Sequence, residues 1–319
     1  MGFSVLKAGM QTTIQDLGRF GFQRFGMVVG GAMDGLAWRL GNMILHNNEN
    51  AAALECTTIG PSLHFEQTQL IAITGADLSA RLDGVPIACW KPILVTAGSV
   101  LSFGKPVSGC RAYICFQNGL DIPQVMHSQS TYLKAKIGGW QGRALQKGDR
   151  IDFCKPYGNA ALQINWRLSP QLYTDLSRTN IRVIKGPQFE DFSKESVEQF
   201  FSESFDITAM SDRMGYRLAS APLRLAHSTE LLSSAVTFGT VQVPPEGQAI
   251  VLMADRPTTG GYPILAQVAS VDLSLLSQKQ AGDALRFELI SLAEAQRLLR
   301  TQERQLLQVK RSIAFKYER

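Results

Sequence analysis

One short unit recurs three times in this chain and limits what it can fold into. GSVLSF (98–103), GDRIDF (148–153) and GDALRF (282–287) each begin with glycine and a small polar residue, alternate, and end on phenylalanine. Glycine adopts turn conformations that other residues avoid, and alternate side chains of a strand point to opposite faces. Each unit is therefore predicted to be a turn that leads into a strand whose phenylalanine reaches a core. Many short strands of this kind favour a barrel or a sandwich over a doubly wound fold.

Other stretches add to the β-rich pattern. QLIAIT (69–74) is typical of a buried strand, and Asp83-Gly84 stands between two short runs as in a hairpin. CRAYICF (110–116) alternates apolar positions, which predicts a half-buried strand. We expect a mainly β chain with few short helices.

Three helices are expected. The first follows Asp34, a capping residue, and the second begins near Ser193. The third is the tail, where Ser291 and Glu294 have the spacing of a capping box. Apolar residues recur every seven positions along it: Leu292, Leu299, Leu306 and Ile313. Over so few heptads, a helix docked on its own barrel is a better interpretation than a coiled-coil dimer.

The chain is long enough for two domains. The β-rich pattern lapses around 155–177, in KPYGNAALQINWRLSP and its neighbours. We predict a first β domain over 1–160, a second over 175–290, and a basic helical tail over 291–319.

Charge and composition exclude several classes of protein. Seven basic and two acidic residues lie between Arg297 and Arg319, which accounts for the whole net charge of +5. Because the rest is balanced, the basicity belongs to the tail and not to a nucleic-acid-binding face. No apolar run approaches the roughly 18 residues that span a bilayer. Five cysteines without metal spacing fit a reducing compartment, so a cytoplasmic location is expected.

Polar residues that strands do not require gather at four places. Arg19 lies among glycines in TTIQDLGRFGFQRFGM and offers a fork for carboxylate or phosphate; a structural Asp–Arg pair is an equal alternative. The second of these places is the segment GGAMDGLAWRLGNMILHNNENAAALE (30–55). Its Asp34 is a plain helix cap by the simpler interpretation, and its Glu55 either points into a cleft or caps a strand.

The other two places lie in the second half. Arg213 stands next to Asp212 in SDRMGYRL and is either held by an ion pair or binds an anion. MADRPTTGGYPILAQV (253–268) combines acid, arginine, hydroxyls and bare backbone. Consecutive amides across 258–261 could make an anion-binding nest, with hydroxyls to orient a small polar substrate. The alternative is a tight turn whose glycines have positive φ, but a turn alone does not require the neighbouring polar residues, so we favour a binding role.

Common self-sufficient sites are missing from the sequence. It has no G-x-x-x-x-G-K-[ST] loop, no G-x-G-x-x-G after a strand and no G-x-S-x-G elbow. The four histidines have no metal spacing. No metal site of its own is expected, and a complete active site is not visible in this one chain.

The motifs together resemble one family. TTIQDLGRFGFQ, GAMDGLAWRLGN, AALECTTIGPSL, SDRMGYRL, MADRPTTGGYP and AGDALRF occur in the order found in the allophanate hydrolase subunit 2-like, biotin-dependent carboxyltransferase-like proteins. The resemblance runs from about Ala8 to Phe287. Within that family, the length and simple architecture resemble the C subunits of bacterial ATP-dependent 5-oxoprolinases.

The resemblance implies tandem cyclophilin-like β-barrels and an active site shared with a companion subunit-1-like chain. A third 5-oxoprolinase subunit is the other partner that it implies, in a hetero-oligomer. The resemblance also implies that the lactam of 5-oxoproline is opened to glutamate with hydrolysis of ATP. The ATP, together with Mg²⁺, would be shared with the partner subunits. The candidate catalytic residues are Arg19, Arg213, Asp255 and Arg256. The candidate substrate-binding residues are Thr258, Thr259, Gly260, Gly261, Tyr262, Asp34 and Glu55. Asp34 and Asp255 would position the arginines or a metal that arrives with ATP.

Two alternatives stay open. The first is carboxyl transfer to urea or a similar small amide, which needs biotin on another chain because no Met-Lys-Met carrier motif is present. The second is a non-catalytic protein that binds and counteracts the inhibitor of a sensor kinase.

Overall fold

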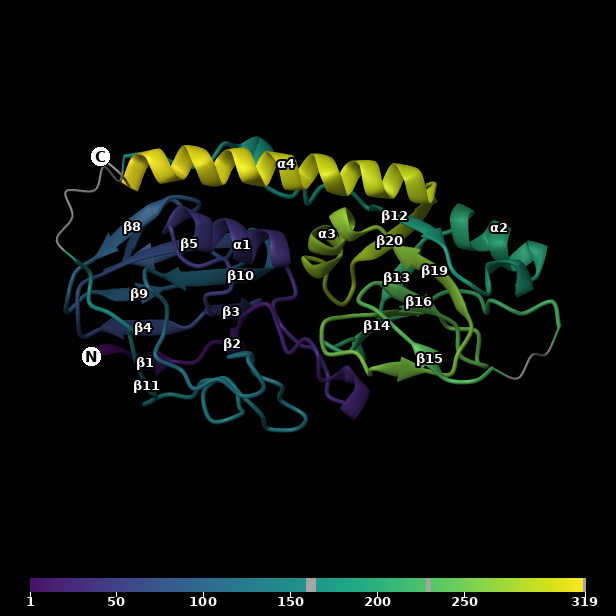
Figure 1. The fold of residues 1–319 in the computed structure, drawn as a ribbon, viewed down its shortest axis with the longest axis horizontal. Helices are drawn as coiled ribbons and strands as arrows, with labels where there is room; N and C mark the ends of the chain where they lie inside the picture. Colours follow the sequence, from purple (N-terminus) through teal and green to yellow (C-terminus); the bar gives the residue numbers. More distant parts are fainter. Residues whose placement is uncertain (159–164, 228–230, 318–319) are drawn as a thin grey trace. The chain divides into compact units, whose positions relative to one another are not determined.

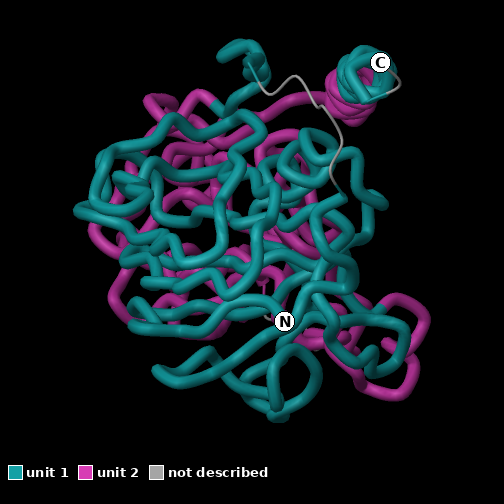
Figure 2. The backbone as a smooth tube through the Cα atoms, turned by 90° about the vertical axis from the view of Figure 1, so that its left-hand side faces the viewer, with its two compact units in different colours: residues 1–19, 30–174, 304–319 teal, residues 20–29, 175–303 magenta. Residues whose placement is uncertain are grey.

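The computed structural model describes residues 1–158, 165–227 and 231–317 and is mainly β, as predicted. The chain forms two compact units (Figures 1 and 2). Unit 1 comprises residues 1–19, 30–174 and 304–319, and unit 2 comprises residues 20–29 and 175–303. Part of the predicted break, 159–164, lies outside the described residues.

Two sheets make up unit 1. The six-stranded sheet has the order β11-β1-β4-β9-β6-β7. Its strands are β1 (Gly2–Lys7), β4 (Ser62–Phe65), β6 (Arg81–Leu82), β7 (Val85–Pro86), β9 (Val100–Ser102) and β11 (Arg150–Asp152). The five-stranded sheet has the order β2-β3-β10-β5-β8. Its strands are β2 (Gln11–Gln15), β3 (Ala53–Thr57), β5 (Gln69–Asp77), β8 (Pro92–Val95) and β10 (Ser108–Phe116).

The two sheets pack on one core that includes Phe3, Phe65 and Phe116. The resemblance implies a barrel here, but the strand pairings of the described residues leave two sheets rather than one closed ring. Consecutive strands β1 and β2 belong to different sheets, so the chain turns a corner between them and the sheets face each other across the core.

Helix α1 (Gly35–Ile44) covers the other face of the five-stranded sheet. Strand β10 was predicted to be half-buried, and this is wrong: every residue from Cys110 to Phe116 is buried. Ala112, Ile114 and Phe116 belong to the core between the sheets, whereas Tyr113 and Cys115 pack with α1. A strand covered on both faces loses the polar side of its alternation.

Unit 2 is built on a closed barrel of the order β12-β19-β16-β17-β14-β13-β20. Its strands are β12 (Asn180–Lys185), β13 (Phe205–Ile207), β14 (Gly215–Ala219), β16 (Thr240–Gln242), β17 (Ile250–Leu252), β19 (Ile264–Val268) and β20 (Ala284–Leu289). Strands β12 and β20 pair in parallel, while the other pairs of the ring are antiparallel. A two-stranded sheet of β15 (Ser234–Ala235) and β18 (Thr259–Gly260) lies outside the ring.

The repeated turn-and-strand units are confirmed. Gly98, Gly148 and Gly282 all have φ between 90° and 93°, in the left-handed region. They precede β9, β11 and β20, and the phenylalanine that ends each unit is packed against a core or buried. The Asp83-Gly84 hairpin is confirmed as well, since both residues have positive φ between β6 and β7.

The three predicted helices are confirmed. Asp34 caps α1, Ser193 caps α2 (Lys194–Ser202), and the tail is α4 (Leu292–Tyr317). The sequence did not predict α3 (Leu273–Ser277) or the 3-10 turns η1 (Gln23–Phe25), η2 (Pro170–Leu172), η3 (Phe189–Asp191) and η4 (Ser270–Asp272). No helix of the described chain is both long and apolar enough to cross a membrane.

Candidate functional site

Two of the four polar segments are joined by the backbone of unit 2. The Asp255 amide donates to the Arg213 carbonyl at 2.8 Å, which extends the pairing between β14 and β17. Segments 211–218 and 253–262, separated by more than thirty positions in the sequence, therefore lie side by side.

The side chains of Arg213 and Asp255 form a buried pair at this junction. Arg213 Nε donates to Asp255 Oδ2 at 3.0 Å, and Nη2 donates to Oδ1 at 3.0 Å. The side chains are 7% and 6% exposed. Two parallel bonds fix both the position and the orientation of the guanidinium, so the pair locks the two segments together. Of the two alternatives for Arg213, the structure has the ion pair.

Arg256 has a different environment from Arg213. It is half-buried; its Nε donates to the Val236 carbonyl and its Nη1 to the Ala254 carbonyl, both at 3.4 Å. Burial lowers the pKa of Arg256, and the charge of Asp255 opposes that shift. The carboxylate of Asp255 is already bonded to Arg213. Arg256 is thus a cation held by long contacts to neutral carbonyls, and an anion would bind it better.

The Thr-Thr-Gly-Gly stretch corrects a prediction. Thr259 and Gly260 form strand β18, which pairs with β15 through Gly260–Ser234 and Thr259–Ala235. Neither Gly260 nor Gly261 has a positive φ, so the stretch is neither an anion-binding nest nor a tight turn. Pairing with β15 holds the backbone extended instead.

Close packing explains why residue 260 is glycine. A Cβ atom there would lie 2.8 Å from Gln242 Oε1 and 3.1 Å from Val236 Cγ1. At Gly261 the nearest atom, Ser233 Oγ, would be 3.5 Å away. The first glycine therefore permits a close approach of β18 to the barrel, whereas the second has room for a side chain.

The hydroxyl groups of this stretch face outward to different degrees. Thr258 is half-buried and its carbonyl accepts from the Val236 amide at 3.3 Å, while Thr259 is exposed. Tyr262 is 44% exposed. A ligand at the surface of unit 2 can reach these groups from solvent.

Asp34 and Glu55 meet inside unit 1. The Tyr113 hydroxyl donates to Glu55 Oε2 at 2.7 Å and accepts from the Asp34 amide at 2.7 Å. Asp34 Oδ1 accepts from the Ala37 amide at 3.0 Å, as a helix cap does, and Glu55 Oε2 also accepts from the Met33 amide at 2.8 Å. Burial, followed by the charges of Glu55 and Asp34, raises the pKa of Tyr113 well above its usual value. These contacts favour a structural role, in which both carboxylates fix the start of α1 against the sheet.

Arg19 is also enclosed within unit 1. It is fully buried, and its Nη2 donates to the Ser130 carbonyl. A Cβ atom at Gly138 would collide with the same nitrogen, so the loop closes tightly over the guanidinium. Nearby, Asp16 accepts hydrogen bonds from the hydroxyls of Ser128 and Ser130. Arg19 thus fixes a loop, and a role toward substrate stays a prediction.

Comparison with known proteins identifies the family. Residues 25–289 match the carboxyltransferase domain, subdomains A and B. The chain belongs to the carboxyltransferase domain family. The match includes Asp34, Glu55, Arg213 and the segment 253–262, but neither Arg19 nor helix α4.

Relatives of two kinds share this carboxyltransferase domain. The C subunit of the 5-oxoprolinase of Haemophilus influenzae is 40% identical over 309 residues, which are 97% of this chain and 98% of that protein. The protein of the same name from Escherichia coli is 38% identical over 94% of this chain and 95% of its own length. The urea amidolyase of Saccharomyces cerevisiae is 33% identical over 92% of this chain but only 17% of its own.

A solved structure has the same fold. The urea amidolyase of K. lactis superposes with a TM-score of 0.89 at 30% identity, over 97% of this chain and 20% of that one. The fold of the carboxyltransferase domain therefore occurs both as a chain of this length and inside a much longer polypeptide.

Two residues that lie beside the predicted site residues were not identified from the sequence. Tyr113 links Asp34 to Glu55, and Gln242 lies beneath Gly260. Each comes from a strand distant in sequence from its partner. The alternation of CRAYICF places Tyr113 on the opposite face from Ile114, but nothing local pairs it with Glu55.

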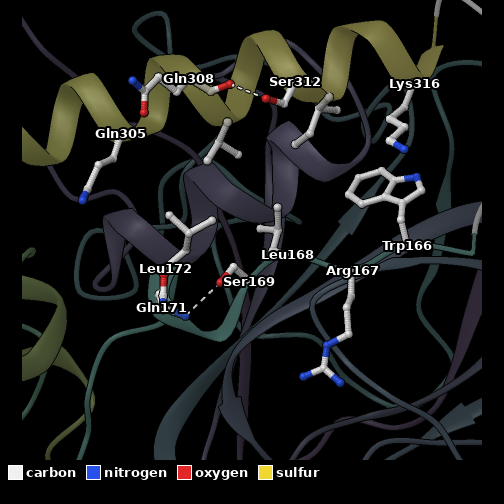
Figure 3. A pocket seen from close by; sticks show the side chains of 12 residues that line it. Trp166, Arg167, Leu168, Ser169, Gln171, Leu172, Gln305, Gln308, Ser312 and Lys316 are labelled. Carbon is white, nitrogen blue, oxygen red and sulfur yellow. Dashed lines mark hydrogen bonds between the residues drawn. The ribbon is translucent and has the colours of Figure 1, made fainter.

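One cavity of about 500 Å³ in unit 1 lies apart from all these residues (Figure 3). The cavity lies between the segment 166–172 and helix α4, with Trp166 and Lys316 at one end and Gln305 at the other. None of the predicted site residues lines it. Within the described ranges, no group of three or more His, Cys, Asp or Glu residues is placed to hold a metal ion.

Proposed function

We propose that this chain is part of an ATP-dependent 5-oxoprolinase that opens 5-oxoproline to L-glutamate. The observation that supports this most is the end-to-end correspondence with two 5-oxoprolinase C subunits, at 97% and 94% of this chain and 98% and 95% of theirs. The urea amidolyases include this domain as less than a fifth of their length.

The reaction sets clear demands on the protein. A lactam is a poor electrophile, so its oxygen is first phosphorylated by ATP, which releases ADP. Water then adds to the ring carbon, the C–N bond breaks to free the amine, and a second water displaces phosphate to leave the new carboxylate. Negative charge spreads over the transferred group and the carbon in these steps, and fixed cations stabilise it.

Unit 2 offers a cation suited to that task. We assign the anion-binding role to Arg256, since Asp255 already bonds Arg213 in the same segment. Thr258, Thr259 and Tyr262 lie next to it in the chain and would orient the substrate. Arg213 and Asp255 then act as positioning residues.

We place ATP and its Mg²⁺ with companion chains. The sequence has no P-loop, and the described residues hold no cluster of metal ligands. A subunit-1-like chain and a third subunit are the partners proposed for a complete hetero-oligomeric enzyme.

A second candidate function is carboxyl transfer to urea or a similar small amide. The 33% identity to urea amidolyases favours it over other reactions. It requires a biotin carrier on another chain, so the two functions differ in the cofactor that must be supplied.

The test is reconstitution with the companion subunits of a 5-oxoprolinase. We expect glutamate to form from 5-oxoproline and ATP only when this chain is present, as measured by chromatography with each component omitted in turn. Assembly without glutamate formation would refute the proposal. Incorporation of labelled bicarbonate into urea with a biotin carrier would establish the second candidate instead.

A further inference from the structure

A buried glutamine near the segment 253–262 has an acceptor atom without a hydrogen bond. Gln242 ends strand β16 and is 6% exposed. Among the described residues, no donor bonds its Oε1, which is itself buried. An amide oxygen removed from water without a donor costs free energy, so such an atom calls for a partner.

This oxygen is directed toward β18. The position that a Cβ of Gly260 would occupy is 2.8 Å from Gln242 Oε1 and 3.1 Å from Val236 Cγ1. Any larger residue at 260 would cover the oxygen. Because residue 260 is glycine, no side chain of β18 lies against this oxygen, although Thr259 and Gly261 on either side of it are exposed.

Arg256 contacts the same neighbour, Val236. Its Nε contacts the carbonyl of Val236, whose side chain lies beside Gly260. Val236 also belongs to a small apolar cluster with Leu252 and Ile264. The guanidinium and the amide oxygen thus both lie near Val236, one supplying N–H donors and the other an acceptor.

We infer that Gln242 Oε1 and Arg256 form an acceptor–donor pair that recognises a carboxylate and an N–H group held on neighbouring atoms of one small ligand. In this arrangement Arg256 binds the carboxylate and Gln242 accepts from the N–H. The inference rests on the proposed function, because an α-carboxy lactam such as 5-oxoproline carries its carboxylate on the carbon next to the ring nitrogen. It makes Gln242 a specificity-determining residue that selects lactams with a carboxylate.

Three related ligands separate the two contacts. 5-Oxoproline has both groups, 2-pyrrolidinone lacks the carboxylate, and 3-oxocyclopentanecarboxylate keeps the carboxylate and the ring carbonyl but has CH2 in place of the N–H. Affinities are measured by calorimetry with the full chain, and with the complex assembled from the companion subunits. We expect the wild-type protein to bind 5-oxoproline at least about tenfold more tightly than either analogue, since a buried polar group left unpaired by a ligand is penalised.

Each variant should change the preference for 5-oxoproline over a different analogue. Arg256→Met should remove the preference over 2-pyrrolidinone, and Gln242→Leu should remove the preference over 3-oxocyclopentanecarboxylate. Gln242→Met has a similar length and no oxygen acceptor, so it should remove the same preference if Gln242→Leu does not fold. The exposed residues Gln280 and Arg286 provide matched controls, Gln280→Leu and Arg286→Met, which should bind as the wild type does.

The outcomes keep this inference apart from the proposed function. Unchanged preferences in folded Gln242 and Arg256 variants, or no binding of 5-oxoproline even by the complex, would overturn the inference. The expected preferences in a complex that forms no glutamate would support the inference and reject the proposed reaction.

Discussion

At the scale of single residues, two adjacent glycines have different reasons to be glycine. Gly260→Ala would place a Cβ within 3.1 Å of both Gln242 Oε1 and Val236 Cγ1. The end of the Gln242 side chain can move and Val236 must shift by a few tenths of an ångström, so we expect a loss of about 1 kcal/mol in the free energy of unfolding, at the low end of the usual cost of overpacking. Urea denaturation measures it.

The neighbouring glycine is the control. Gly261→Ala meets its nearest atom at 3.5 Å, so its free energy of unfolding should change by less than about 0.5 kcal/mol. Equal stability of the two variants would show that β18 does not approach the barrel as closely as described.

Individual residues also show what the sequence could predict. Asp34 was identified as a cap because capping depends on residues three positions apart, and Asp34 does accept from Ala37. The contacts of Glu55 with Tyr113 and of Gln242 with Gly260 join strands far apart in the chain, and no local pattern encodes them.

At the scale of elements, helix α4 docks by one side of its last turns. Leu306 is 2% exposed and packs with α1, whereas Leu307 is 48% exposed. Leu306→Ala should lower the free energy of unfolding by about 2–5 kcal/mol. Leu307→Ala should change it by less than about 0.5 kcal/mol.

Thermal or urea denaturation of the two variants checks this prediction. A similar small change in both would mean that α4 contributes little to the stability of unit 1. The heptad pattern predicted this face only in part, because Leu292 and Leu299 are 57% and 36% exposed. A straight helix turns by about 20° per heptad relative to a seven-residue repeat, so one stripe does not stay on one face.

A buried carboxylate at the end of η4 binds this turn to strand β12. Asp272 is 1% exposed and accepts from the Arg182 amide at 2.8 Å and from its Nε at 2.9 Å. Burial raises the pKa of Asp272, but the hydrogen bonds and charge of Arg182 outweigh it and lower the pKa below its usual value. Its contribution to stability is therefore full above the unfolded pKa of about 3.9 and is lost as the pH falls through the lower, folded pKa.

Replacing this carboxylate should change how the free energy of unfolding depends on pH at acid pH. Asp272→Asn should lower the free energy of unfolding by about 1–3 kcal/mol at neutral pH, because the arginines that lose their partner are partly exposed, and this free energy should then fall less steeply below about pH 4. Denaturation curves from about pH 3 to about pH 7 measure both effects, with Asp206→Asn, an exposed position on β13, as a variant expected to follow the wild type. If the free energy of unfolding of Asp272→Asn fell with pH as steeply as that of the wild type, the Asp272 carboxylate would not have the stabilising role assigned to it.

At the scale of the whole molecule, the sequence predicted the strands better than their assembly. Glycine turns and alternation are local, and they correctly predicted a mainly β chain. The compact units are not local: 20–29 belongs with 175–303, and 304–319 belongs with the first half. Such exchanges depend on which surfaces pack together, which a single sequence does not display.

The measurement that tests the account most directly is 5-oxoproline-dependent ADP release by the reconstituted enzyme. We predict that release requires this chain, falls at least about tenfold with Arg256→Lys because lysine lacks the planar fork, and is unchanged with Arg286→Lys. Lactam-dependent release that persists without this chain, or that is equal in the two variants, would contradict the account.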